Sequence, residues 1–477
     1  MKRGDECDAV IEDLAVEGKS VARIDGFVVF VRGGVPGDVL RVRIRTVKRN
    51  FAEADLLALL KPSPHRTEPR CRYFGTCGGC TLQNVAYASQ LEFKQRQVAE
   101  ALARLGGFAS PAVPVPLACA DPYFYRNKME FSFGERWRTT GEMAELSFRD
   151  DLSGGAVRDP ALGLHLPGRY DRILDLFECW LQSESSARIV NFVRAFCLEE
   201  KLPVFSTLTQ SGYLRNLVIR GSKRTGETMV NLVTYDDRPD VMTKFTARLL
   251  AEFPALTTVV NNITARRSQV AVGERETVYH GTGTITERIG KRTYRISANS
   301  FFQTNTEQAE RLYDTALRFA QLRPEDTVYD LYSGTGTIAL HVADGARSVV
   351  GIESVEQSVL DARRNAESNG VHNCVFLQGD LKDTLLSSRR GGDPLPAPDV
   401  VIADPPRAGM HEKVAREIVS LSPRTIVHVS CNPSTQARDL KIICESGKYS
   451  IHSIQPVDMF PHTQHIENVV GLINSFQ

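Results

Sequence analysis

The chain has 477 residues, about three times the length of an ordinary domain, so a single small binding module is excluded. Its 58 basic and 57 acidic side chains nearly cancel, and 42% of its residues are hydrophobic, which excludes disordered and fibrous proteins. A nucleic-acid partner stays open, because such a partner reads a local basic patch and not the net charge.

The N-terminus carries no apolar signal region, and no stretch of about 18 apolar residues could span a bilayer. We therefore expect a cytoplasmic protein with no membrane contact. Its 10 cysteines should stay reduced, so clustered cysteines indicate metal ligands or nucleophiles and not disulfides.

Residues 1–61 contain short β-type runs and are expected to form a first domain, a small β-barrel. Alternation with period two places Arg41, Arg43 and Arg45 on one face of a strand. Such a cationic wall could follow a phosphate backbone, although a merely solvated strand face is an equal alternative.

Three cysteines follow a Pro-rich linker that begins at residue 61. Cys71, Cys77 and Cys80 have the spacing C-x5-C-x2-C, and the glycines between the last two allow tight backbone wrapping. Soft thiolates select zinc or an iron–sulfur cluster, and spacing does not separate the two. Three ligands require a fourth from elsewhere in the chain.

Residues 62–295 are expected to form a mixed α+β central domain. It begins with a helix over about 84–105, which Gly106 and Gly107 end. A second helix is expected around Ser186–Glu199. The predicted strands are Met129–Phe133, Leu217–Arg220, Met229–Val233 and Thr258–Asn261.

Residues 296–477 alternate between strands and helices, which predicts a doubly wound parallel sheet of the Rossmann type. Helices are expected over Glu307–Gln321 and Thr337–Ala343. The expected strands are 327–331, 348–353, 374–377, 399–403 and 425–430.

A glycine-rich turn follows the first of these strands, between Asp330 and Gly336. Glu353 ends the next strand, where a carboxylate suits a ribose diol, and Asp380 follows the third strand. The third glycine of a dinucleotide site is missing, which favours a nucleoside without phosphates, such as S-adenosylmethionine. Alternatively, Asp380 only caps a helix.

Two further sequences lie where ligands bind in an open sheet, outside the carboxyl ends of the strands. Asp404-Pro-Pro-Arg presents a carboxylate on a stiff segment, and Ser430-Cys431-Asn-Pro leaves a thiol at a strand end. A thiolate there would be a strong nucleophile. Glu467, in a later strand-like run, would be a general base if buried and an ordinary edge charge if solvated.

A series of motifs closely resembles those of the RNA uracil-5-methyltransferases that use S-adenosylmethionine, and the resemblance covers almost the whole chain. The motifs are Asn299-Ser-Phe-Phe-Gln303, Asp330-Leu-Tyr-Ser-Gly334, Gly351-Ile-Glu353, Asp404-Pro-Pro-Arg407, Ser430-Cys431-Asn-Pro433 and His465-Ile-Glu467. The resemblance implies that Cys431 adds to carbon 6 of uracil and that Glu467 removes the carbon 5 proton after methyl transfer. It also implies cofactor contacts by Gln303, Tyr332, Glu353, Asp380 and Asp404. Thr337 departs from the family pattern, in which Asn often follows the glycine turn.

The cysteine cluster resembles the [4Fe–4S] site of the ribosomal members of this family. Their fourth ligand lies in a Cys-x-Leu-Gln setting, which Cys179 fits, and Cys119 is the weaker candidate. Residues 1–60 resemble a TRAM domain, an RNA-binding barrel. The tRNA-modifying bacterial enzymes typically lack both features, so the resemblance implies an exposed or unfolded loop of 23S ribosomal RNA as the substrate of a monomeric enzyme.

Cations and aromatic rings that could clamp a splayed-out RNA loop lie at Tyr125–Met129 and at Phe301 and Phe302, although either phenylalanine could equally be core. The same uracil methylation on a tRNA is an alternative, and two rival functions remain. One is methylation of another acceptor such as an exocyclic amine, and the other is an inactive iron–sulfur RNA-binding protein or redox sensor. Cys431 and Glu467 speak against both.

Overall fold

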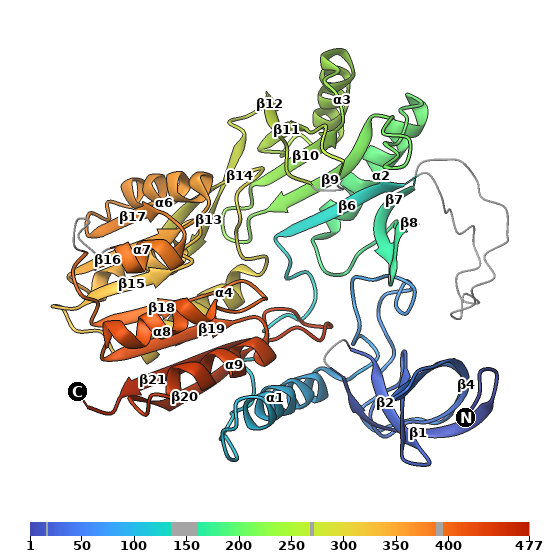
Figure 1. The fold of residues 1–477 in the computed structure, drawn as a ribbon. Coiled ribbons are helices and arrows are strands. Elements are labelled where there is room, and N and C mark those ends of the chain that lie inside the picture. The colour runs from blue at the N-terminus through green and yellow to red at the C-terminus, as the bar shows by residue number, and fades with distance from the viewer. Residues whose placement is uncertain (16–17, 135–160, 268–270, 388–394, 477) are drawn as a thin grey trace.

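The computed structural model describes residues 1–15, 18–134, 161–267, 271–387 and 395–476. These residues form a closed barrel, a seven-stranded central sheet, a two-stranded hairpin and a seven-stranded C-terminal sheet (Figure 1). The expected fold class is confirmed. No helix in the described ranges is both long and apolar enough to cross a membrane.

Five strands close the N-terminal barrel in the order β1-β2-β3-β5-β4. They are β1 (Glu6–Leu14), β2 (Ser20–Ile24), β3 (Phe27–Val31), β4 (Val39–Val47) and β5 (Phe51–Lys61). Alternation along β4 buries Leu40, Val42 and Ile44 inside the barrel and leaves Arg41 and Arg43 exposed, as its period predicts.

The charges of the expected cationic wall on β4 are balanced by acidic residues of the neighbouring strands β1 and β5. The pairs are Arg41 with Asp8, Arg43 with Glu6 and Arg45 with Glu53. The arginines lie on the barrel surface, each beside an acidic partner. The partners of Arg41 and Arg43 are distant in the chain and adjacent only in the barrel.

Helix α1 (Tyr87–Arg104) confirms the helix predicted over 84–105 and joins two parts of the molecule. Its Phe93 packs against Val35, which lies between β3 and β4 of the barrel. Val98 and Leu102 enter a core beneath the C-terminal sheet, and Figure 1 shows α1 beside α9 (Pro433–Cys444). This helix therefore fixes the barrel against the C-terminal part.

A buried ion pair anchors α1 to the segment between the last two strands. Lys94 Nζ lies 2.5 Å from Asp458 Oδ1, and the two side chains are 1% and 0% exposed. Lys94 also donates to the Phe460 carbonyl at 3.1 Å, and the Tyr87 hydroxyl donates to Asp458 Oδ2 at 2.8 Å. These bonds hold residues 458–460 from one side.

We expect Lys94→Met to destabilise the protein by about 3–5 kcal/mol, because it leaves the Asp458 carboxylate buried without its cation. Urea unfolding followed by circular dichroism measures the loss. The double variant Lys94→Met, Asp458→Asn is the control and should recover part of it, since no uncompensated charge remains. A loss below about 1 kcal/mol in the single variant, the level of a surface pair, would show that the pair is not buried in solution.

The central sheet has the strand order β12-β11-β10-β9-β6-β7-β8. Its strands are β6 (Lys128–Gly134), β7 (Ala161–Leu166), β8 (Arg169–Asp175), β9 (Leu214–Gly221), β10 (Thr228–Thr234), β11 (Thr258–Ile263) and β12 (Arg275–His280). Helices α2 (Glu184–Glu199) and α3 (Pro239–Glu252) share one core with it. The four predicted strands and the first of these helices are confirmed, whereas α3 and the other strands were not predicted.

A hairpin of β13 (Thr284–Ile289) and β14 (Arg292–Ser297) precedes the C-terminal sheet, whose order is β17-β16-β15-β18-β19-β21-β20. Its parallel strands are β15 (Thr327–Leu331), β16 (Ser348–Glu353), β17 (Cys374–Gln378), β18 (Val400–Ala403) and β19 (Thr425–Ser430). These strands confirm the predicted alternation. The winding reverses between β15 and β18, which opens a crevice at their carboxyl ends.

Helices cover both faces of this sheet, as the doubly wound class requires. One face carries α4 (Thr306–Ala320), α5 (Thr337–Val342) and α6 (Glu356–Ser368). The other carries α7 (Leu381–Ser387), α8 (Glu412–Leu421), α9 and α1. Two antiparallel strands, β20 (Tyr449–Val457) and β21 (Glu467–Asn474), close the edge next to β19.

Candidate active site

The glycine-rich turn after β15 is held by a buried carboxylate. Asp330 Oδ2 accepts a hydrogen bond from the Ala339 amide at 2.9 Å, and burial raises the pKa of Asp330 to about 8. Gly336 has φ +79°, and a Cβ there would lie 2.8 Å from the Phe376 ring, so only glycine fits. The Gly334 amide donates to Glu353 Oε2 at 3.0 Å, which joins the turn to the end of β16.

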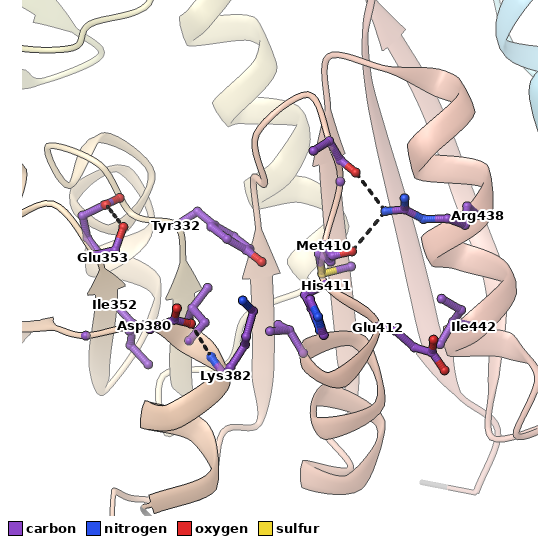
Figure 2. A pocket seen from close by; sticks show the side chains of 16 residues that line it. Tyr332, Ile352, Glu353, Asp380, Lys382, Met410, His411, Glu412, Arg438 and Ile442 are labelled. Carbon is purple, nitrogen blue, oxygen red and sulfur yellow. Dashed lines mark hydrogen bonds between the residues drawn. The ribbon is translucent and has the colours of Figure 1, made fainter.

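A cavity of about 570 Å³ opens beside this turn, and Tyr332, Glu353 and Asp380 are among the residues that line it. Figure 2 shows the Tyr332 ring between Glu353 and the segment that begins at Met410. Asp380 also accepts from the Lys382 amide at 2.9 Å, so it caps α7 as well as facing the cavity. The capping interpretation of Asp380 is thus confirmed, and its cofactor contact stays a prediction.

The other two expected cofactor residues are not among those that line this cavity. Gln303 precedes α4, and its carbonyl accepts from the Asn127 side chain at 2.8 Å. Asp404 follows β18 and is half-buried. Desolvation raises its pKa to about 6, although the charge of His428 lowers it. Its charge raises the pKa of both Asp330 and Cys431.

Cys431 and Glu467 are brought together by the antiparallel pairing of β19 with β21. The last paired residues are Ser430 and Asn468, and the next step along each strand is Cys431 and Glu467. Glu467 is 5% exposed. The 36-residue separation in sequence thus becomes a direct apposition at a strand end.

Both groups bind their protons more tightly than they would in water. Burial, followed by the charges of Glu467 and Asp404, raises the pKa of Cys431 to about 11. Burial and the charge of Asp404 raise the pKa of Glu467 well above its ordinary value. In both cases the charge of Arg407 acts in the opposite direction.

The Asp404-Pro-Pro-Arg407 segment is fastened to α9, directly after Cys431. The Asn432 side chain caps α9 at Ser434 and donates to the Arg407 carbonyl at 3.1 Å. Arg438 donates to the carbonyls of Ala408 and Met410, each at 3.0 Å, as the dashed lines in Figure 2 show. These contacts were not predicted. The sequence shows that the residues are polar, but not which partners they bind.

Four cysteines from two distant segments lie within electrostatic reach of one another. Cys71, Cys77, Cys80 and Cys179 all have pKa values raised chiefly by burial, and the charge of Cys179 acts on each of the other three. Cys119 instead donates to the Asp121 carbonyl at 3.0 Å. In the described part of the chain, no three His, Cys, Asp or Glu side chains are grouped closely enough to hold a metal ion.

The cysteine loop is bonded to the turn that precedes Glu467. The amides of Thr81 and Leu82 donate to the His462 carbonyl at 2.9 and 3.0 Å. The Thr81 hydroxyl donates to Gln464 Oε1 at 2.7 Å. The cysteine region and the end of β21 are therefore structurally joined.

The aromatic side chains that were expected near RNA divide into two groups. Phe302 is 5% exposed and belongs to a core, whereas Phe301 is 65% exposed. Tyr125 is 3% exposed and donates to the Pro461 carbonyl at 3.3 Å. Of these three, only Phe301 is available for stacking on a base.

Comparison with known proteins shows to which family the chain belongs. The family model of the tRNA (uracil-5-)-methyltransferases matches residues 222–475, and the TRAM domain model matches residues 1–57. The chain belongs to the uracil-5-methyltransferase family. RNA methyltransferases of Chlorobaculum tepidum and Porphyromonas gingivalis are 43% and 41% identical to it, each over 98% of this chain and over 96% and 99% of their own.

A solved relative of this uracil-5-methyltransferase is the tRNA (uracil-54, C5)-methyltransferase of Pyrococcus abyssi, in complex with S-adenosyl-L-homocysteine. It is 29% identical, has a TM-score of 0.74, and the match covers 98% of this chain and 100% of the relative. The protein is therefore an S-adenosylmethionine-dependent RNA methyltransferase of the uracil-5 type, and the resemblance inferred from the motifs is confirmed. The N-terminal barrel is a TRAM domain.

Proposed function

We propose that the enzyme methylates carbon 5 of a uridine in 23S ribosomal RNA through a covalent adduct between Cys431 and carbon 6. The apposition of Cys431 and Glu467 carries the proposal, since it places a thiol and a buried carboxyl at one point beside the cofactor turn. Carbon 5 of uracil is not nucleophilic until a thiolate has added at carbon 6. The thiol and the carboxyl are therefore the two groups that this reaction needs.

The two residues act in sequence. The Cys431 thiolate bonds to carbon 6, and the ring electrons then form the enolate whose carbon 5 takes the methyl group. Glu467 accepts the carbon 5 proton, the double bond reforms, and the bonding pair at carbon 6 returns to sulfur as thiolate. S-adenosylmethionine would supply the methyl group from a positively charged sulfur, since the sulfur–methyl bond breaks and its electron pair stays on the sulfur of the departing neutral thioether.

The cavity beside the glycine turn suits the nucleoside part of S-adenosylmethionine. Glu353 is placed to accept from the ribose hydroxyls, and Tyr332 and Asp380 line the remaining space. Asp330 Oδ1 and Ser333 Oγ are buried beside the turn without a hydrogen-bond partner, as expected where a polar ligand completes a site. We assign Asp404 and Gln303 to the inner end of the cofactor site. Asp404 would also orient the uracil base.

We also propose a [4Fe–4S] cluster on Cys71, Cys77, Cys80 and Cys179, whose binding would have to draw together thiols that are not grouped closely enough to hold a single metal ion. The Gly79 amide and the Gln83 side chain donate to the sulfurs of Cys77 and Cys80 at 3.4 and 3.3 Å. Such hydrogen bonds stabilise thiolates that bind iron–sulfur clusters. We assign the cluster a structural role, since methyl transfer needs no electron.

We expect anaerobically purified protein to be brown and to contain about four iron and four sulfide ions per chain. Cys179→Ala should lose most of the iron, because it removes a ligand, whereas Cys119→Ala, the matched control, should retain it. Iron and sulfide analysis with visible spectroscopy measures this. One zinc ion without sulfide would overturn the cluster, and retention of iron by Cys179→Ala alone would move the fourth ligand to Cys119.

RNA would lie across the face that the cysteine loop shares with the turn before Glu467. A second cavity of about 430 Å³ lies there, lined by Arg126 and Lys128 together with Gly78, Gly79 and residues 463–465. The cations can hold phosphate, and Phe301 can stack on a base. The TRAM domain adds a further RNA-binding surface.

Two classes of RNA are candidate substrates, 23S ribosomal RNA and tRNA. The cysteine set and the TRAM domain favour 23S ribosomal RNA by resemblance, whereas the Pyrococcus abyssi relative acts on tRNA. Mapping 5-methyluridine in both RNAs from cells with and without the gene tests this. Loss of a ribosomal 5-methyluridine supports the proposal, and loss of a tRNA 5-methyluridine alone would replace it by the tRNA alternative.

A further inference from the structure

We propose that Arg407 supplies the positive charge that favours ionisation of both the Cys431 thiol and the Glu467 carboxyl. The inference rests on the proposed function, because it assigns a positioning residue to the nucleophile and base named there. Arg407 ends the Asp404-Pro-Pro-Arg407 motif, but no role has been assigned to its side chain above.

The geometry places Arg407 beside the thiol. Its carbonyl accepts from the side chains of Asn432 and Thr435 at 3.1 and 3.2 Å, and Asn432 directly follows Cys431. Two prolines stiffen the segment before it, and Arg438 holds the two carbonyls at Ala408 and Met410 that follow. The Arg407 backbone is thus fixed at the end of β19, on the side of the reacting pair.

The guanidinium of Arg407 is exposed, and no carboxylate in the described ranges forms an ion pair with it. The neighbouring arginines differ in this respect: Arg438 pairs with Asp439, and Arg416 pairs with Glu412. An arginine whose backbone is fixed near two carboxyls and a thiol, and whose side chain forms no ion pair in the described ranges, keeps its charge available to the reacting groups.

The charges around the pair come from several elements. Glu467 on β21 and Asp404 after β18 both oppose ionisation of Cys431, and Asp404 also opposes ionisation of Glu467. His428 of β19 acts on Asp404, and Arg407, Lys94 and Arg126 act on His465 before β21. Arg407 is the cation that acts on both Cys431 and Glu467, in the direction that favours their charged forms.

The reaction needs these charged forms. Cys431 must lose its proton before its sulfur pair bonds to carbon 6, and Glu467 must be a carboxylate before it can accept the carbon 5 proton. Two neighbouring carboxyls alone would keep the thiol protonated. A guanidinium on this fixed backbone lowers the cost of each ionisation without taking a proton itself, because arginine stays charged throughout.

The test uses the full-length enzyme and measures alkylation of Cys431 by iodoacetamide, followed on its own peptide by mass spectrometry between pH 7 and 9.5. Below the thiol pKa the rate follows the thiolate fraction, so a rise of one pKa unit slows alkylation about tenfold. We expect Arg407→Met to slow it by about that factor. It should also lower kcat at least tenfold while KM for S-adenosylmethionine changes less than about threefold.

Arg407→Lys keeps the charge and should recover much of the alkylation rate. Arg188→Met, which removes an exposed arginine of α2 paired with Glu252, is the matched control and should change nothing. An unchanged alkylation profile in a folded Arg407→Met protein would overturn the proposal. Turnover by Cys431→Ala would instead overturn the proposed function, and the alkylation result would stand independently of it.

Discussion

Cys431→Ala is expected to abolish methylation while S-adenosylmethionine still binds. The sulfur bonds to the uracil ring, and without it carbon 5 never becomes nucleophilic, so no residual route to the product exists. The proposed cofactor cavity is lined by Tyr332, by residues of β16, by the loops after β17 and β18 and by side chains of α7, α8 and α9, and Cys431 is not among them. Affinity should therefore change by less than about tenfold, or about 1.4 kcal/mol.

Transfer of a labelled methyl group to RNA and equilibrium binding of the cofactor measure the two properties separately. Cys444→Ala at the end of α9 is the matched control, since that thiol lies outside the site and its loss should leave turnover intact. Retained turnover in Cys431→Ala would remove the nucleophile from the mechanism. It would favour methylation of an acceptor such as an exocyclic amine, which needs no thiol.

Glu467→Gln is expected to trap the enzyme on its RNA. The base acts only after the methyl group has moved, so Cys431 can add and methyl transfer can occur, but the adduct cannot resolve. Loss of a proton acceptor typically slows a reaction about 10²–10⁴-fold, whereas glutamine preserves the size of the buried side chain. A labelled, slowly migrating protein–RNA band should appear on a denaturing gel.

The double variant Cys431→Ala, Glu467→Gln should form no such band, because the sulfur that makes the bond is absent. Glu445→Gln, at the exposed C-terminal end of α9, is the control and should release product normally. Methylated RNA released from Glu467→Gln at the wild-type rate would falsify the role of Glu467 and leave it as a buried charge at a strand end.

The single variant Glu467→Gln should be at least as stable as the wild type at alkaline pH. Because the folded-state pKa of Glu467 is raised, its contribution to stability is present at low pH and declines as pH rises through that value. Glutamine does not titrate, so this decline disappears. Thermal unfolding at pH 6 and pH 9 should therefore show a smaller difference for Glu467→Gln than for the wild type.

The sequence by itself determined the features that depend on local pattern. The period of β4, the helix α1 and the alternation from β15 to β19 follow from where apolar residues recur along the chain. Gly336 and Asp330 are recognisable because a sharp strand-to-helix turn demands those residue types. The family motifs likewise lie in short contiguous stretches.

Only the tertiary structure decided which distant residues meet. In the fold, Arg41 pairs with Asp8, and Phe302 is buried whereas Phe301 is exposed. Cys179 lies near three cysteines that are far from it in the chain. The tertiary structure also placed Glu467 next to Cys431 through the antiparallel register of β21, which no period in the sequence reveals. The physical reason is that hydrophobic period reports which face of one element is buried, whereas pairing between elements is set by long-range packing and register.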